Sequence, residues 1–348
     1  MKNVHLCITY AHLLLALSET IRDGDIEHVI FMPIDFQYVS PRLRRRLKES
    51  FPNIRFVFIK EAYFIRSFSG GGAFLPGVIR RNISFKKGYI ITPFTWKLYN
   101  YFDQSFDKFY CYHSGPFLAK VLAGHSQNTT LRVDGFASYQ FQKVTFLKGM
   151  VRLVFGLSPK RQIWGEEKWV DAVEAPEPDM IPCSLVRQKT RQVFDVFNIL
   201  REETIKSKLM WCFGVSETYY SKANQQALLL TQPISEAGLC SLEFKHALYQ
   251  SLLEKLKNKG LDVIVKRHPK EIDVMPLGCP ELPLDFPVEL LHLLGVRFKV
   301  GVALNTAALN TNTPIAQQHM QLIPLEHFYA HCTSMWNDLI AKKLKMLN

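Results

Sequence analysis

Three short stretches place polar or charged side chains directly after apolar runs that have the pattern of buried strands. In an open α/β sheet, ligands bind at the carboxyl ends of the strands, so these side chains are candidates for chemistry. The stretches are Val133-Asp134-Gly135, Lys266-Arg267-His268-Pro269 and Asn305-Thr306. They supply a carboxylate, an imidazole among cations, and an amide beside a hydroxyl. This set suits proton transfer at a substrate that carries phosphate.

The first stretch offers a candidate general base. Gly135 lets the chain turn sharply after the strand, which would point the Asp134 carboxylate into a cleft. An Asp-Gly turn with a solvated or capping carboxylate is the ordinary alternative. The residues alone leave both interpretations open.

The second stretch offers a candidate general acid. Pro269 restrains His268 toward an extended backbone, and Lys266 and Arg267 add positive charge at the same point. Histidine titrates near neutrality and can donate a proton to a departing phosphate. A solvated basic strand end is the alternative.

The third stretch offers a candidate phosphate site. Asn305 and Thr306 follow the apolar run 301–304 where a helix would begin, and their side chains and free backbone N–H groups could bind phosphate. Either residue could instead cap the helix. The two roles are compatible.

An alternation of strand and helix patterns positions these stretches. In the first half, strands are predicted at 4–9, 26–32, 54–59, 109–112 and 128–132, and helices at 11–22 and 41–50. After a helix at 184–208, the second half has strands at 227–230, 261–266 and 298–304 and a helix at 242–259. The segment 157–182 is rich in Trp, Pro and mixed charges. We therefore predict an α/β protein with domains 1–175 and 176–348.

The amino-acid composition and the net charge exclude several classes of protein. The chain has 348 residues, 47% of them hydrophobic and 21% charged, which excludes a disordered, collagenous or multi-span membrane protein. The formal charge of +12 favours an anionic partner, either nucleic acid, a nucleotide-sugar or an acidic membrane. No known RNA- or DNA-binding motif accompanies this charge, so nucleic acid is not predicted as a partner.

No metal or cofactor site is predicted. Seven scattered cysteines without C-x-x-C or zinc spacing indicate reduced thiols of a cytoplasmic protein. Asp23-Gly24-Asp25 has a metal-binding spacing but falls between a helix and a strand start, where a turn is expected. Gly70-Gly71-Gly72 lacks the setting of a nucleotide-binding loop and is interpreted as a mobile loop over the cleft.

The sequence does not decide whether this protein contacts a membrane. No apolar run is long enough to span a bilayer, and residues 4–17 are interpreted as a strand leading into a helix rather than a signal peptide. Two basic clusters are either solvated faces or contacts to the anionic inner face of a membrane. They are Arg42, Arg44, Arg45, Arg46 and Lys48, and Lys342, Lys343 and Lys345.

Together the three stretches resemble the bacterial sialyltransferases, including lipooligosaccharide sialyltransferases and capsular polysialyltransferases. Those enzymes share an acidic-acidic-Gly motif, a His-Pro motif and a phosphate loop, in this order, and Val133 stands here in place of the first acidic residue. The segments 8–14 and 286–291 are also similar to family patterns. The resemblance implies a GT-B fold, with two Rossmann-like doubly wound domains facing a central cleft. It implies a metal-independent, inverting transfer of sialic acid from CMP-sialic acid to a lipooligosaccharide, O-antigen or capsule acceptor.

The resemblance also implies site residues. Asp134 would deprotonate the acceptor, and His268 would act as general acid toward the CMP phosphate. Glu236, after the strand 227–230, is the alternative base. Donor-binding residues would be Thr231, Lys266, Pro269, Glu289, Asn305 and Thr306, with Glu289 on the ribose, and acceptor-binding residues would be Thr9, Tyr10 and Gly135.

Two other functions remain open on the sequence. A related transferase could use CMP-Kdo or CDP-glycerol, because a His-Pro phosphate site does not by itself select the sugar. A catalytically silent glycan-binding relative is the non-enzyme alternative. The acceptor, the linkage and the oligomeric state are not encoded in any motif.

Overall fold

The computed structural model describes residues 1–62, 106–133, 139–154, 157–193, 197–216, 220–271, 276–309, 314–324 and 335–345. The chain forms two compact units. Unit 1 contains Met1–Gln37 and Leu47–Ile199, and unit 2 contains Tyr38–Arg46 and Leu200–Asn348.

Unit 1 is built on a seven-stranded parallel sheet in the order β3-β2-β1-β4-β5-β8-β9. The strands are β1 Lys2–Leu6, β2 Glu27–Pro33, β3 Ile54–Ile59, β4 Phe106–Cys111, β5 Ser126–Arg132, β8 Ala172–Ala175 and β9 Thr190–Gln192. Its first five strands follow the 3-2-1-4-5 order of a Rossmann sheet.

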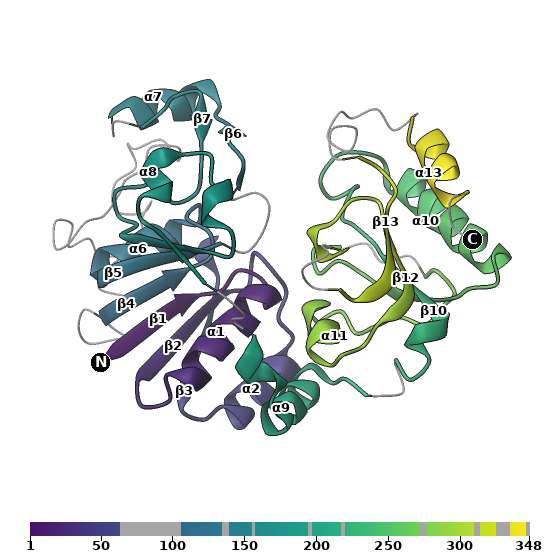
Figure 1. Ribbon diagram of the computed structural model, residues 1–348, viewed down its shortest axis with the longest axis horizontal. Helices are drawn as coiled ribbons and strands as arrows, with labels where there is room; N and C mark the ends of the chain where they lie inside the picture. The colour runs from purple at the N-terminus through teal and green to yellow at the C-terminus, as the bar shows by residue number, and fades with distance from the viewer. Residues whose placement is uncertain are drawn as a thin grey trace. The chain divides into compact units, whose positions relative to one another are not determined.

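Helices α1 Tyr10–Arg22, α2 Pro41–Ser50 and α6 Phe117–His125 belong to this βα alternation. Strand β2 is a nearly continuous apolar run, with Val29, Ile30 and Phe31 fully buried, as expected for a strand that is covered on both faces. Figure 1 shows the sheet in purple to teal with α1 packed along it. Beside it, β6 Gln142–Lys143 and β7 Arg161–Gln162 form an antiparallel pair next to α7 Phe146–Val154.

Unit 2 has a four-stranded parallel sheet in the order β11-β10-β12-β13. The strands are β10 Gln226–Leu230, β11 Asp262–Lys266, β12 Phe298–Ala303 and β13 Ala316–Gln321. The helices are α9 Glu203–Phe213, α10 Leu242–Asn258, α11 Glu289–Leu293 and α13 Trp336–Leu344. Leu252 and Leu256 of α10 and Trp336 of α13 join one apolar core with these strands.

The α/β class with two Rossmann-like units is therefore confirmed. GT-B proteins contain two such units in one chain, which is the architecture expected from the sequence. Asp23-Gly24-Asp25 forms the turn between α1 and β2, at the amino edge of the sheet, as predicted. The Gly70-Gly71-Gly72 run lies outside the described residues.

The predicted helix at 184–208 is wrong. The structure has the short helix α8 Ser184–Arg187, then β9, a 3-10 turn Asn198–Arg201 and α9. The cause is pairing across the sheet: the Val173 amide donates to the Lys189 carbonyl at 2.9 Å, and the Val193 amide donates to the Ala175 carbonyl at 3.1 Å. Strand pairing has overridden the local helix propensity of this segment.

This pairing also moves the division between the units. The sequence places it after residue 175, whereas β9 belongs to the first sheet and unit 2 resumes at Leu200. Residues 38–46, including the start of α2, are grouped with unit 2 rather than with their sequence neighbours.

The cysteines and hydropathy give two further observations. Six described cysteines are free thiols, and burial raises the pKa of Cys7 and Cys111, which makes these two inert. Among the described residues, no helix combines the length and the hydropathy required to cross a bilayer.

Candidate active site

The carboxyl edge of the unit 2 sheet collects most of the predicted donor-binding residues. Thr231 follows β10, His268 and Pro269 follow β11, and Asn305 with Thr306 follows β12. These strands are neighbours in the sheet, so their ends lie along one edge. The structure thus places the predicted donor-binding residues of the β10, β11 and β12 loops along one edge of this sheet.

A buried ionic cluster holds the first two loops at this edge. The Glu271 carboxylate accepts the Thr231 hydroxyl and, at 2.8 Å, the His268 backbone amide. The Lys245 ammonium lies 3.0 Å from Glu271 and 2.9 Å from Glu236. Both Lys245 and Glu271 are buried, so the cluster is held within the unit and fixes where the backbone of residue 268 lies.

His268 presents one ring nitrogen. Its Nδ1 accepts the Lys270 backbone amide at 3.1 Å, which places the proton of the neutral ring on Nε2. Within the described part of the chain, Nε2 makes no hydrogen bond. Burial lowers the pKa of His268 to about 4, with Lys270 and Lys266 acting in the same direction and Glu271 opposing. The ring is therefore a neutral Nε2–H donor at pH 7 when no anion is bound.

The two cations before His268 are engaged in positioning the chain. Lys266 Nζ donates to the carbonyls of Arg267 at 2.6 Å and Leu284 at 3.2 Å, and burial lowers its pKa to about 8. Arg267 forms a two-pronged ion pair with Glu281, with both contacts at 2.7 Å. The structure therefore gives Lys266 a role in linking β11 to the loop before α11.

The predicted phosphate loop is held by two glutamines. Gln232 accepts the Asn305 amide at 2.9 Å and donates to the Asn305 carbonyl. Gln321, at the end of β13, accepts the Thr306 amide at 2.9 Å. The Asn305 side-chain amide donates to the Ile323 carbonyl at 2.9 Å. These bonds join the ends of β10, β12 and β13 into one polar rim.

Thr306 also acts as a local cap, as the sequence allowed. Its hydroxyl accepts the Ala308 amide at 3.2 Å at the start of a 3-10 turn, Ala307–Leu309. Glu289 is the first residue of α11, and its charge raises the pKa of Lys266 against the effect of burial. Glu289 therefore lies at the start of α11, directly after the loop that Lys266 holds.

The predicted acceptor side lies in unit 1. Thr9 caps α1 by accepting the His12 amide at 3.2 Å, and the Tyr10 amide donates to Gln37 at 3.2 Å. Tyr10 is buried, so its ring belongs to the packing at the start of α1. Asp134 and Gly135 lie outside the described residues; the strand before them ends with the Val133 amide donating to the Glu174 carbonyl at 2.8 Å.

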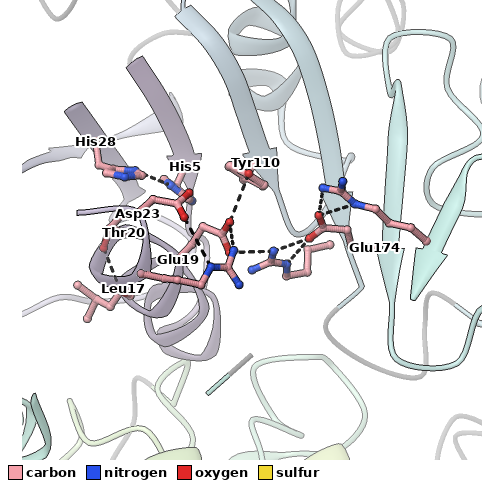
Figure 2. A network of polar contacts seen from close by, with 11 residues as sticks. His5, Leu17, Glu19, Thr20, Asp23, His28, Tyr110 and Glu174 are labelled. Atoms are coloured by element: carbon pink, nitrogen blue, oxygen red, sulfur yellow. Dashed lines mark hydrogen bonds and ion pairs between the residues drawn. The ribbon is translucent and has the colours of Figure 1, made fainter. Parts of the chain in front are cut away.

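A buried charge network fixes the end of this strand (Figure 2). Arg132 donates to Glu174 at 2.7 Å and to Glu19 at 3.1 Å, and its guanidinium lies 5.6 Å from the Tyr110 ring centre. Arg191 pairs with Glu174 from the solvent side. Three elements, α1, β5 and β8, are thus tied together one residue before the Val133-Asp134-Gly135 stretch.

Two buried histidines lie beside this network. His5 Nε2 and His28 Nδ1 are 3.3 Å apart, and His5 stacks on Tyr110 at 4.9 Å between ring centres. Burial lowers the pKa of both imidazoles. They are neutral core residues of the sheet and add no acid or base to the strand ends.

Sequence reasoning missed the residues that support this site. Lys245 and Glu271 carry its ionic cluster, and Gln232 and Gln321 carry its rim. Lys245 could have been found, because it falls three and four residues before the apolar Leu248 and Tyr249, on the core-facing side of a helix. Glu271 and the glutamines leave no periodic signal.

The arrangement can bind and protonate an anionic leaving group. It combines an imidazole N–H, a polar rim with fixed backbone, and nearby cations at one sheet edge. Among the described residues, no group of three or more His, Cys, Asp or Glu side chains lies close enough to hold a metal ion.

Similar solved structures include spinosyn rhamnosyltransferase SpnG complexed with thymidine diphosphate, 9% identical, covering 99% of this chain and 91% of that one, with a TM-score of 0.43. Arabidopsis thaliana UGT89C1 complexed with UDP is 10% identical and covers 99% and 93%, with a TM-score of 0.45. No curated protein matches the chain.

A family model described as alpha-2,8-polysialyltransferase matches residues 79–275, which is more than half of the chain. The matched segment includes Val133-Asp134-Gly135 and the His268 loop. The resemblance to sialyltransferases is thereby confirmed, and the protein is a glycosyltransferase. The chain belongs to the alpha-2,8-polysialyltransferase family.

Proposed function

We propose that the protein transfers sialic acid from CMP-sialic acid to a bacterial surface glycan, with inversion and without a metal ion. The observation that carries the proposal is His268, whose Nε2–H is presented at the end of β11 by the buried Glu271 cluster. A monophosphate leaving group needs charge-assisted hydrogen bonds, and this edge of unit 2 offers them.

In the proposed reaction, the bond between the anomeric carbon of the sugar and the CMP phosphate breaks as the acceptor oxygen bonds to that carbon. The phosphate leaves with the bonding electron pair and receives the Nε2 proton of His268 in its imidazolium form, which the bound phosphate favours, and the ring is left as the neutral imidazole. The acceptor hydroxyl loses its proton to a carboxylate. Inversion requires that this base act on the sugar face opposite the phosphate, and Asp134 belongs to a different unit from His268.

Asp134 is preferred over Glu236 as the base. The Glu236 carboxylate is paired with Lys245 at 2.9 Å, and its hydrogen bonds to Lys245 and Ser235 lower its pKa despite partial burial. A carboxylate stabilised in this way accepts a proton less readily. We assign Glu236 the role of holding Lys245, and through it Glu271, in place.

CMP release tests the function. We expect the purified protein to release CMP from CMP-sialic acid in the presence of a galactoside or sialoside acceptor and of EDTA. Release from CMP-Kdo or from a CDP-linked donor instead would assign the related transferase reaction. If none of these donors is turned over, the protein is a glycan-binding relative of the transferases, and the proposal is wrong.

The state of His268 gives a second test. Because burial holds the pKa of His268 at about 4 in the free protein, the ring must gain basicity before it can deliver a proton at pH 7. A bound phosphate favours the imidazolium, so CMP should raise this pKa by about one unit or more. NMR titration of the His268 ring protons, assigned with His268→Gln, measures it.

Cytidine is the matched control ligand, because it lacks the phosphate. It should leave the His268 titration where it is in the free protein. An equal pKa with and without saturating CMP would show that the phosphate binds elsewhere and would remove His268 from the acid role.

We also propose a cytoplasmic location. The free thiols of the described cysteines, three of them buried, support a reducing compartment.

A further inference from the structure

Helix α7 exposes an unusual number of large apolar side chains. Phe146 is 80% exposed, Leu147 66%, Met150 53% and Leu153 51%. At roughly 100° per residue, these four positions fall within about 120° of the helix circumference. The helix therefore carries a continuous apolar stripe that does not enter the core of unit 1.

The opposite face of α7 is fixed to the protein. Arg152 makes a buried ion pair with Glu166 at 2.6 Å and donates through Nε to the Ser158 carbonyl at 2.8 Å. At Gly149 a Cβ would lie 2.5 Å from the Pro159 carbonyl oxygen, so this position must be glycine for the helix to approach so closely. Figure 1 shows α7 beside β6 and β7 at one extremity of the unit. The apolar stripe is thus presented by a rigid support.

The charged residues of the segment that carries the stripe have one sign. Residues 141–161 contain Lys143, Lys148, Arg152, Lys160 and Arg161 and no Asp or Glu. Lys143, Lys160 and Arg161 are exposed, and the Arg161 guanidinium lies 4.2 Å from the ring centre of Phe141, which is itself 37% exposed. An apolar stripe rimmed by cations is the pattern of a helix that lies in the interface of an anionic bilayer.

We propose that α7, with the β6–β7 pair, is the surface by which this protein binds an anionic membrane. The stripe would enter the boundary between headgroups and acyl chains, and Lys143, Lys160 and Arg161 would contact lipid phosphates. An enzyme bound in this way meets a lipid-linked glycan at the surface where the glycan is anchored. The inference gives the proposed glycosyl transfer a location but does not depend on which donor is used.

Flotation of the full chain with lipid vesicles tests the surface in the absence of any sugar nucleotide, so its outcome is independent of the transferase test. We expect binding to vesicles of phosphatidylglycerol and phosphatidylcholine in equal parts, and weaker binding to phosphatidylcholine alone or in high salt. The double variant Phe146→Ser, Met150→Ser should lower the partition coefficient at least about tenfold. Lys160→Ser, Arg161→Ser should lower it on the mixed vesicles only.

Met180→Ser, Leu185→Ser is the matched control, because both side chains are 56% exposed and belong to the same unit but not to α7. It should bind like the wild type, and circular dichroism should show every variant folded. The proposal is overturned if the wild type does not float with the mixed vesicles, or if the α7 variant floats equally well. In the first of these cases, sedimentation shows whether the stripe binds a second copy of the chain instead. A dimer that the α7 variant loses would assign the stripe to that contact.

Discussion

Replacement of His268 by alanine is expected to lower kcat for sialic acid transfer by about 10²–10⁴-fold, the range typical for loss of a general acid. The effect follows from the proposed role of the ring, whose imidazolium would donate the Nε2 proton to the leaving phosphate. The fold should survive, because the Glu271 contact is made to the His268 backbone amide and not to its ring. Steady-state CMP release with saturating donor measures the loss.

Lys270→Ala is the control for this change. Lys270 is exposed in the same loop, and its contact to His268 Nδ1 is made by the backbone amide, which alanine retains. We expect its kcat to stay within a few-fold of the wild type. His268→Gln separates two roles of the ring: substantial activity in that variant would mean that His268 contributes a hydrogen bond but no proton.

The second large effect is expected for Arg132→Met in unit 1. Removal of the guanidinium leaves the buried carboxylates of Glu19 and Glu174 without the cation between them. Breaking a buried ion pair in this way costs about 3–5 kcal/mol of folding free energy. Denaturant unfolding, with hydrogen exchange on peptides from β5 to locate the transition in unit 1, measures the loss.

Arg191→Met is the matched control, because it removes the other cation on Glu174. The Arg191 side chain is 60% exposed, so its loss should cost about 1 kcal/mol or less. Adding Glu174→Gln to Arg132→Met should recover part of the stability, because the unpaired charge is removed. If Arg132→Met and Arg191→Met lower stability equally, the network is not the support of unit 1 that we infer.

Local patterns predicted the elements of this fold well wherever a single period decided them. The basic helix 41–50 and the strand 54–59 have the predicted bounds, because amphipathic spacing identifies the helix and a short apolar run identifies the strand. The segment 184–208 failed, since β9 exists only through its pairing with β8. Strand β13, with Gln317, Gln318 and His319 in its middle, has no apolar run to reveal it.

The residues of the candidate site also differ in whether a local pattern could predict them. His268 and Asn305 could be found because the carboxyl-edge rule needs only the strand ends. Lys245, Glu271 and Gln232 act across 9 to 73 residues of sequence, through contacts that no local period encodes. The proposed α7 surface also escaped the sequence reasoning, which considered membrane contact only at the basic clusters 42–48 and 342–345 and left solvated faces as the alternative there.

Residues 38–46 have a consequence for the biogenesis of the chain. They are translated early, between β2 and β3, but their partners in unit 2 come after Leu200; Arg46 Nη1, for example, donates to the Trp211 carbonyl at 2.7 Å. A ribosome-bound intermediate with only unit 1 complete therefore exposes the amino-terminal half of α2 without its later partners. For the same reason, a cut between residues 199 and 200 yields two fragments that are each incomplete. Circular permutation or joining of the 38–46 segment to the second fragment would be needed to obtain unit 2 as an autonomous domain.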